Sequence, residues 1–188
     1  MGTGDGVFAY RMAKAQPDTL VIGLDSNAEN LRDISHKASL KPTKGGLQNV
    51  MFGQVSLEEA PGELAGLADS VSVILPWGAL LGAVARPDLE SLLKLAALCK
   101  PNAKVTILYG YGLQDQSMIT SLGLPALRGQ NSDYLQSRFG SSYLASGFKM
   151  KFQYVSVETV RDLPSRWAKK LAFSGQDRVF VRIEGHRA

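Results

Sequence analysis

The sequence predicts an α/β fold with a mostly parallel sheet, and three observations support this prediction. Short apolar segments alternate with amphipathic segments along most of the chain, as in doubly wound sheets. A glycine-rich turn, Gly2-Thr3-Gly4-Asp5-Gly6, stands where a strand should hand over to a helix. An acidic residue, Asp25, ends the apolar segment 19–24, about 20 residues further on. A glycine loop followed by an acid at that spacing is typical of a nucleoside-binding half-fold.

The first half of the chain contains three predicted strands and the helices between them. The glycine loop leads into a helix from Val7 to about Ala15, which is followed by a strand over 19–24. Ser26 or Asn27 can cap the next helix, which should run to about residue 40. Lys41-Pro42 ends it, and 42–46 should form an exposed loop. Further strands are predicted over 49–55 and 70–75.

The second half continues the alternation. Helices are predicted over 79–85, 88–99, 113–122, 131–146 and 164–173, and strands over 102–109, 148–157 and 178–183. The last two strands should form an antiparallel hairpin at one edge of the sheet. The sequence shows no internal repeat and no long linker, so residues 1–188 are expected to form a single domain.

The composition narrows the class of protein. Hydrophobic residues make up 45% and charged residues 20% of the chain, which is ordinary for a folded soluble protein. The single cysteine, Cys99, excludes an intrachain disulfide and a multi-cysteine metal site, and it suits a reducing compartment. No apolar run approaches the length of a membrane span. We therefore expect a cytoplasmic protein with no membrane contact and no bound metal.

The net charge of +4 is unevenly placed. Residues 1–160 carry 14 Lys/Arg and 14 Asp/Glu, whereas the rest of the chain carries 7 and 3. A second basic stretch, formed by Lys37, Lys41 and Lys44, lies in a segment with no acid between Asp33 and Glu58. Two basic patches on a neutral body suggest a polyanionic partner docked on one face. The alternative is a solvated lysine surface without a partner.

The glycine spacing separates two classes of nucleotide-binding protein. Dinucleotide-binding loops have the pattern G-x-G-x-x-G, whereas this chain has G-x-G-x-G. The shorter pattern is similar to motif I of S-adenosylmethionine (SAM) methyltransferases, in which the loop packs against the amino-acid end of SAM. An ordinary tight turn is the alternative. A nicotinamide oxidoreductase is the least favoured interpretation, because the loop does not have the dinucleotide spacing.

Five motifs then occur in one order. They are Gly2-Thr3-Gly4-Asp5-Gly6, Ile22-Gly23-Leu24-Asp25, Lys41-Pro42-Thr43-Lys44-Gly45-Gly46-Leu47, Leu75-Pro76-Trp77-Gly78 and Ser165-Arg166-Trp167-Ala168-Lys169-Lys170-Leu171-Ala172-Phe173. The series resembles the aminoglycoside-resistance 16S rRNA (adenine-1408)-N1 methyltransferases over nearly the whole chain. The resemblance implies a Rossmann-like, SAM-dependent methyltransferase fold. It also implies methyl transfer from SAM to N1 of the decoding-site adenine of 16S rRNA in the 30S subunit, by a monomer.

The resemblance assigns roles to individual residues. In that family two tryptophans sandwich the flipped adenine, and by motif position these are Trp77 and Trp167. Ser165 and Lys170 match positions implicated in orienting the target or gripping RNA. The positions that match SAM contacts are Gly2, Gly4, Asp25, Leu57, Glu58 and Ala79. The basic residues expected to hold RNA are Lys37, Lys41, Lys44, Lys170 and Arg178.

The chemistry of the proposed target is compatible with these residue types. N1 of adenine carries an in-plane lone pair, so methylation there requires no strong general base. The enzyme must instead extrude the base, hold it and align it with the methyl donor. An Asn-Pro-Pro-Tyr-like tetrad, which would indicate attack through an exocyclic amine, is absent at the end of the 70–75 strand. The alternative for Trp77 and Trp167 is that both are packed core residues.

The chain departs from the family at its N-terminus. Relatives carry further strands before the glycine loop, including a central strand between those predicted here over 19–24 and 70–75. We therefore expect the sequence to be an N-terminally shortened version of the domain, with unpaired strand edges facing the gap. Two other functions stay open from the sequence alone. They are a small-molecule SAM methyltransferase and a shortened, inactive homologue that only binds the ribosome.

Overall fold

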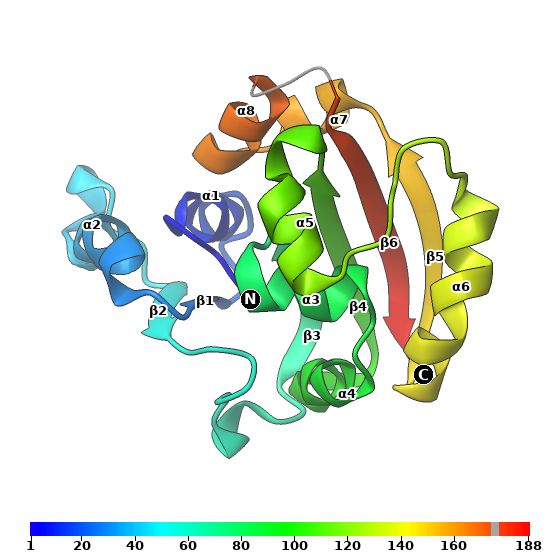
Figure 1. Ribbon diagram of the computed structural model, residues 1–188. Coiled ribbons are helices and arrows are strands. Elements are labelled where there is room, and N and C mark those ends of the chain that lie inside the picture. The colour runs from blue at the N-terminus through cyan, green and yellow to red at the C-terminus, as the bar shows by residue number, and fades with distance from the viewer. Residues whose placement is uncertain (174–176) are drawn as a thin grey trace.

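The computed structural model describes residues 1–173 and 177–188, and within them the strands form two sheets (Figure 1). The smaller sheet pairs β1 (Val21–Asp25) in parallel with β2 (Val50–Gln54). The larger sheet has the order β3-β4-β6-β5, made by β3 (Ala68–Ile74), β4 (Cys99–Tyr111), β6 (Val179–Arg187) and β5 (Phe148–Val155). β3 and β4 are parallel, and β6 runs antiparallel to both of its neighbours.

Helices follow the strands in the order that an α/β fold requires. They are α1 (Val7–Ala15), α2 (Ala28–Ser39), α3 (Gly78–Ala85), α4 (Leu89–Leu98), α5 (Gln116–Leu122), α6 (Ser132–Ala145), α7 (Val157–Arg161) and α8 (Arg166–Phe173). Short 3-10 turns are η1 (Pro42–Lys44), η2 (Gly62–Leu64) and η3 (Leu113–Asp115). The α/β class predicted from the sequence is confirmed.

Two hydrophobic cores flank the larger sheet. The main core lies between this sheet and α3, α4 and α6, and includes Leu81, Leu95, Ile107 and Phe148. Cys99 is buried there as well. A second cluster joins α7 and α8 to the strands and contains Leu75, Leu108, Val160, Ala168, Leu171 and Phe180. Figure 1 shows α3, α4 and α5 in front of the sheet, with α7 and α8 near one end of its strands.

The sheet divides between β1 and β3. Within residues 1–173 and 177–188, no strand lies between them, and the N-terminal residues enter the space instead. The Met1 amino group donates to the Ser72 carbonyl of β3 at 3.0 Å. The Thr3 amide donates to the Leu24 carbonyl of β1 at 2.9 Å. Residues 1–3 therefore link the two sheets at the end where the glycine loop begins.

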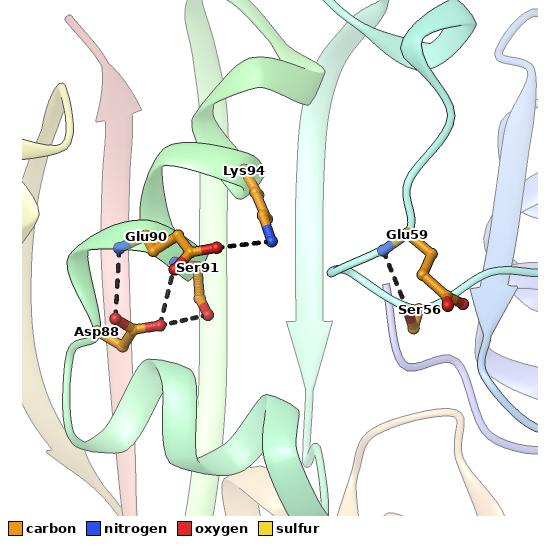
Figure 2. Close-up of polar contacts among 6 residues, drawn as sticks. All are labelled: Ser56, Glu59, Asp88, Glu90, Ser91 and Lys94. Atoms are coloured by element: carbon orange, nitrogen blue, oxygen red, sulfur yellow. Dashed lines mark hydrogen bonds and ion pairs between the residues drawn. The ribbon is translucent and has the colours of Figure 1, made fainter.

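Polar caps fix the starts of two helices. The Asn27 side chain accepts from the Glu29 amide at 3.0 Å at the start of α2, so Asn27, one of the two predicted candidates, is the cap. At α4 the Asp88 carboxylate accepts from the amides of Glu90 and Ser91 at 3.3 and 3.2 Å (Figure 2). It also accepts from the Ser91 hydroxyl, and these bonds lower the pKa of Asp88.

The structure corrects several predicted boundaries. β4 begins at Cys99 rather than at 102, because a register shift between Ala68↔Cys99 and Ser70↔Lys104 carries the strand past Pro101. Residues 157–161 form α7, which the sequence does not predict, since the alternation of apolar and polar residues in β5 continues to Val157 and predicts a strand over 148–157. β5 and β6 pair antiparallel as predicted, yet β6 extends to Arg187, and α7 and α8 separate the two strands. They are therefore not a hairpin.

Candidate functional site

The glycine loop lies at the C-terminal end of β1 and opens α1. Gly2, Gly4 and Gly6 all have positive φ angles, of 65°, 57° and 66°. A Cβ on Gly6 would lie 2.6 Å from Ile34 and 2.7 Å from Phe52, so close packing also requires glycine there. A Cβ on Gly4 would meet no atom within 4 Å, so this turn of the loop faces open space. The loop can therefore receive a ligand against its backbone.

Asp25 sits at the tip of β1 and contacts this loop directly. Its Oδ2 accepts from the Gly4 amide at 2.7 Å, and its Oδ1 accepts from the Asn27 amide at 3.0 Å. Oδ1 also accepts from the Asn30 side-chain amide at 3.5 Å. Since a carboxylate can accept about four hydrogen bonds, Oδ2, which has one of these three donors, keeps acceptor capacity for a ligand hydroxyl. Burial lowers the pKa of the nearby Met1 amino group to about 6, and the Asp25 carboxylate partly offsets this.

The other residues predicted to contact SAM differ in exposure. Glu58 is exposed beyond the end of β2, in a turn where the Ser56 hydroxyl accepts from the Glu59 amide at 3.2 Å (Figure 2). Ala79 is exposed in the first turn of α3. The Leu57 side chain is buried in the main core, so only its backbone could face a ligand.

The two tryptophans, 90 positions apart in sequence, meet beside the end of β3. The ring centroids of Trp77 and Trp167 are 6.0 Å apart, and the rings are nearly perpendicular, at 89°. Trp77 is 47% exposed. Trp167 is held in place, because its Nε1 donates to the Leu75 carbonyl at 3.2 Å and its ring packs against the second core cluster.

The predicted binding of a base between these two rings would require a change in their arrangement. A planar base stacked on both rings needs them parallel, so one ring must turn before a base can enter between them. Trp77 is the half-exposed ring and has the room to turn. Its backbone setting is unusual as well, since Leu75 has a φ of 52° and Gly78 a φ of 58°. A non-glycine residue in this region is strained, and such strain is found preferentially at functional sites.

Ser165, directly before α8, and Lys170, on α8, flank Trp167. The Ser165 hydroxyl accepts from the Ala168 amide at 3.2 Å, which caps this helix. The Lys170 ammonium lies 5.5 Å from the centroid of the Trp167 ring and is exposed. Both residues therefore stand beside the aromatic pair, and the ammonium group is free to approach a phosphate.

The basic loop, which we define as residues 41–46, contains Lys41 and Lys44 with exposed side chains. It is a tight turn, in which the amides of Lys44 and Gly46 both donate to the Lys41 carbonyl, at 2.8 and 3.1 Å. Lys37 is exposed at the end of α2, and its ammonium lies 4.6 Å from the centroid of the Tyr10 ring. The three predicted lysines thus form one local basic surface.

The prediction that Arg178 holds RNA is wrong for this structure. Its side chain is only 3% exposed and forms an ion pair of 2.8 Å with Asp115, which is 8% exposed. It also donates to the Gly110 carbonyl at 3.1 Å, and Asp115 accepts from the Gly112 amide at 2.9 Å. The pair braces the end of β4 against the start of β6. No local pattern in the sequence predicts this ion pair, since the partners are 63 positions apart.

None of the helices in the described part of the chain has the length and apolar character needed to cross a membrane. The candidate site combines a glycine loop with a carboxylate, a pair of tryptophans and an exposed basic surface. Together they suit a ligand with hydroxyl groups, a planar ring and an anionic polymer.

Comparisons with known proteins give a consistent result. Residues 1–186 match the family model described as NpmA, 16S rRNA (adenine(1408)-N(1))-methyltransferase. A curated relative from Escherichia coli, named 16S rRNA (adenine(1408)-N(1))-methyltransferase, is 38% identical over 188 residues, which cover 99% of this chain and 84% of the relative.

Solved structures agree with the sequence relatives. A variant of the 16S rRNA (adenine(1408)-N(1))-methyltransferase from Catenulisporales acidiphilia, solved with cosubstrate SAM, matches with a TM-score of 0.83 at 28% identity, over 100% of this chain and 83% of that chain. The aminoglycoside resistance methyltransferase NpmB1 matches with a TM-score of 0.75 at 34% identity, over 98% of this chain and 84% of that chain.

Proposed function

The chain belongs to the 16S rRNA (adenine(1408)-N(1))-methyltransferase family, and from that premise we propose how its residues carry out the reaction. The activity is the transfer of a methyl group from SAM to N1 of this adenine of 16S rRNA, which confers resistance to aminoglycosides. Membership of this family disfavours the alternative of a methyltransferase that acts on a small molecule.

The glycine loop and Asp25 are proposed to hold SAM. The open space at Gly4 supports contact between the loop backbone and the cofactor, and the remaining acceptor capacity of Asp25 Oδ2 suits a ribose hydroxyl. Glu58 and Ala79 would contact the cofactor from the ends of β2 and β3, as would the backbone of Leu57. Bound SAM supplies a methyl group made electrophilic by its positive sulfonium.

Trp77 and Trp167 are proposed to hold the flipped adenine, with Ser165 orienting it. Because N1 carries its own lone pair, the residues around it need only position the base and exclude other orientations. The hydrogen bond from Trp167 to Leu75 fixes one ring, and the exposure of Trp77 lets the second close over the base. Stacking contributes about 1–3 kcal/mol per base.

The exposed lysines are proposed to dock the enzyme on rRNA. Lys37, Lys41 and Lys44 lie at or beside the basic loop, and Lys170 lies beside the tryptophans. Contacts of this kind with phosphates position a protein on a nucleic acid without selecting a base. Base selection then falls to the aromatic pair, so docking and target choice would be separate steps.

One observation carries this assignment of roles: Trp77 and Trp167 meet at 6.0 Å with one ring half-exposed. The test is methylation of purified 30S subunits with labelled SAM, followed by primer extension. A methyl group on N1 blocks Watson–Crick pairing, so the extension should stop at this adenine. Subunits with guanine at that position serve as the control and should accept no methyl group.

The assay also separates the remaining alternative. A chain that binds 30S subunits but transfers no methyl group would be a homologue that only docks. A stop at another nucleotide would contradict the proposed base selection. We further propose that residues 1–188 act as a single domain and a monomer, since docking and base-holding residues both lie on one chain; light scattering can check the second point. A ribosomal substrate implies action in the cytoplasm.

A further inference from the structure

Tyr10 joins two parts of the molecule that the function uses separately. It lies in the first turn of α1, where its amide donates to the Gly6 carbonyl of the glycine loop at 2.9 Å. Its side chain is 7% exposed, and its hydroxyl donates to the Gly45 carbonyl of the basic loop at 2.5 Å. One helical turn and one side chain therefore connect the glycine loop with the basic loop.

The fit around this hydrogen bond is close. Gly45 has a φ of 92°, and a Cβ at that position would lie 3.1 Å from the Tyr10 hydroxyl and 3.1 Å from the Lys37 side chain. The ring of Tyr10 also supports Lys37, whose ammonium lies 4.6 Å from the ring centroid. Tyr10 thus contacts the basic surface both through its hydroxyl and through its ring.

We propose that Tyr10 is a positioning residue for rRNA binding, whose hydroxyl fixes the place of Lys41 and Lys44 relative to the glycine loop. This inference rests on the proposed function. The docked enzyme must present its methyl donor at a fixed distance from the phosphates that it grips, because methyl transfer requires close alignment. Without the Tyr10 hydrogen bond the basic loop would keep its internal turn but could shift relative to the glycine loop, and fixing its place during binding weakens affinity.

The alternative is that Tyr10 is an ordinary buried tyrosine, whose loss lowers stability without a specific effect on RNA. The two explanations predict different measurements. A positioning residue changes the KM for 30S subunits through the lysines that it places. A merely structural residue changes the melting temperature, and its effect does not depend on whether those lysines are present.

The experiment uses Tyr10→Phe, which keeps the ring and its contact with Lys37 but removes the hydroxyl. We expect the KM for 30S subunits to rise about three- to tenfold, as for loss of one hydrogen bond, with kcat and SAM affinity within about twofold of wild type. In a Lys41→Ala/Lys44→Ala background the same change should have no further effect on KM.

Two further variants sharpen the result. Tyr143→Phe is the matched control, since the Tyr143 hydroxyl donates to the Val84 carbonyl at 2.9 Å in the buried core. It should change the melting temperature but not the KM for 30S subunits. Gly45→Ala disturbs the same contact from the other side, so it should raise KM in the same direction as Tyr10→Phe.

Several outcomes would overturn the inference. They are an unchanged KM in Tyr10→Phe, an equal effect in the background without the two lysines, or a parallel loss of kcat and SAM affinity. Filter binding of 30S subunits is measured alongside methylation. If wild type binds 30S subunits without methylating them, the proposed function fails, and the comparison between wild type and Tyr10→Phe is read from the binding constants instead.

Discussion

The geometry of the tryptophan pair leads to a quantitative prediction for Trp77→Ala. Trp77 is 47% exposed and touches Trp167 edge-on, so truncation removes only part of a buried surface and one aromatic contact. An aromatic contact of this kind contributes about 0.5–1.5 kcal/mol, whereas truncation of a buried tryptophan costs about 3–5 kcal/mol. We therefore expect Trp77→Ala to lower the free energy of unfolding by less than truncation of a buried tryptophan would.

The effect on methylation should be larger than the effect on stability. Loss of one stacking face removes about 1–3 kcal/mol of base binding, which corresponds to a decrease of about 5- to 150-fold in methyl transfer. Affinity for 30S subunits should stay near that of wild type, because docking rests on the lysines. Trp77→Phe should keep part of the activity, since the smaller ring still offers a stacking face.

Melting temperature, 30S binding and single-turnover methylation should be measured on the same samples. Leu89→Ala is a suitable control, because Leu89 is 46% exposed, nearly as much as Trp77, and lies on α4. It should leave methylation unchanged. A stable Trp77→Ala variant with normal binding and normal methylation would falsify the stacking role. A variant that unfolds would show that the ring serves the core instead.

Three other predictions concern the cofactor, the basic loop and the buried ion pair. Asp25→Asn should weaken SAM binding by about tenfold or more in calorimetry, since hydrogen bonds to a charged acceptor are lost; unchanged affinity would remove Asp25 from the SAM site. Lys41→Glu with Lys44→Glu should weaken 30S binding and reduce its salt slope by about two units, and a slope equal to that of wild type would argue against phosphate contacts. Arg178→Met should cost about 3–5 kcal/mol of stability, because Asp115 is left charged and buried; a melting temperature like that of wild type would contradict this.

The sequence was sufficient for the α/β class and the glycine loop, whereas the family resemblance predicts Trp77 and Trp167 on the two sides of one base, and the structure brings the two rings within 6.0 Å of each other. These features depend on local patterns or on motifs in a fixed order. α7 was missed because the β5 alternation continues to Val157, while the cap that starts the helix is a single hydrogen bond from the Thr159 amide to Ser156. A cap of this kind competes with strand alternation and cannot be ranked against it from sequence alone.

Long-range polar contacts were the main features that the sequence could not supply. Arg178 belongs to a basic segment, which predicts contact with RNA. Its burial depends instead on an ion pair with Asp115, far away in the chain. The orientation of the tryptophan rings is similar, because it follows from a hydrogen bond to the Leu75 carbonyl. Charge counts and motif order contain no information on which side chains become buried together.

The residues that we propose for holding the base and the cofactor rest on different sheets. The tryptophan pair stands on the larger sheet, at the end of β3, whereas Asp25 lies at the tip of β1 in the smaller one. Residues 1–3 link the sheets through hydrogen bonds to Ser72 on β3 and Leu24 on β1.

Methyl transfer is sensitive to small displacements, since a misplacement of about 1 Å can cost about a hundredfold in rate. In the proposed arrangement, the alignment of methyl donor and base depends on the contacts between the two sheets, among them the hydrogen bonds of residues 1–3. The basic loop is tied to the same junction by Tyr10, through α1 and the glycine loop. A disturbance at residues 1–3 would move the lysines and the glycine loop together, relative to the tryptophan pair on the larger sheet. It should therefore lower kcat before it lowers affinity for the 30S subunit.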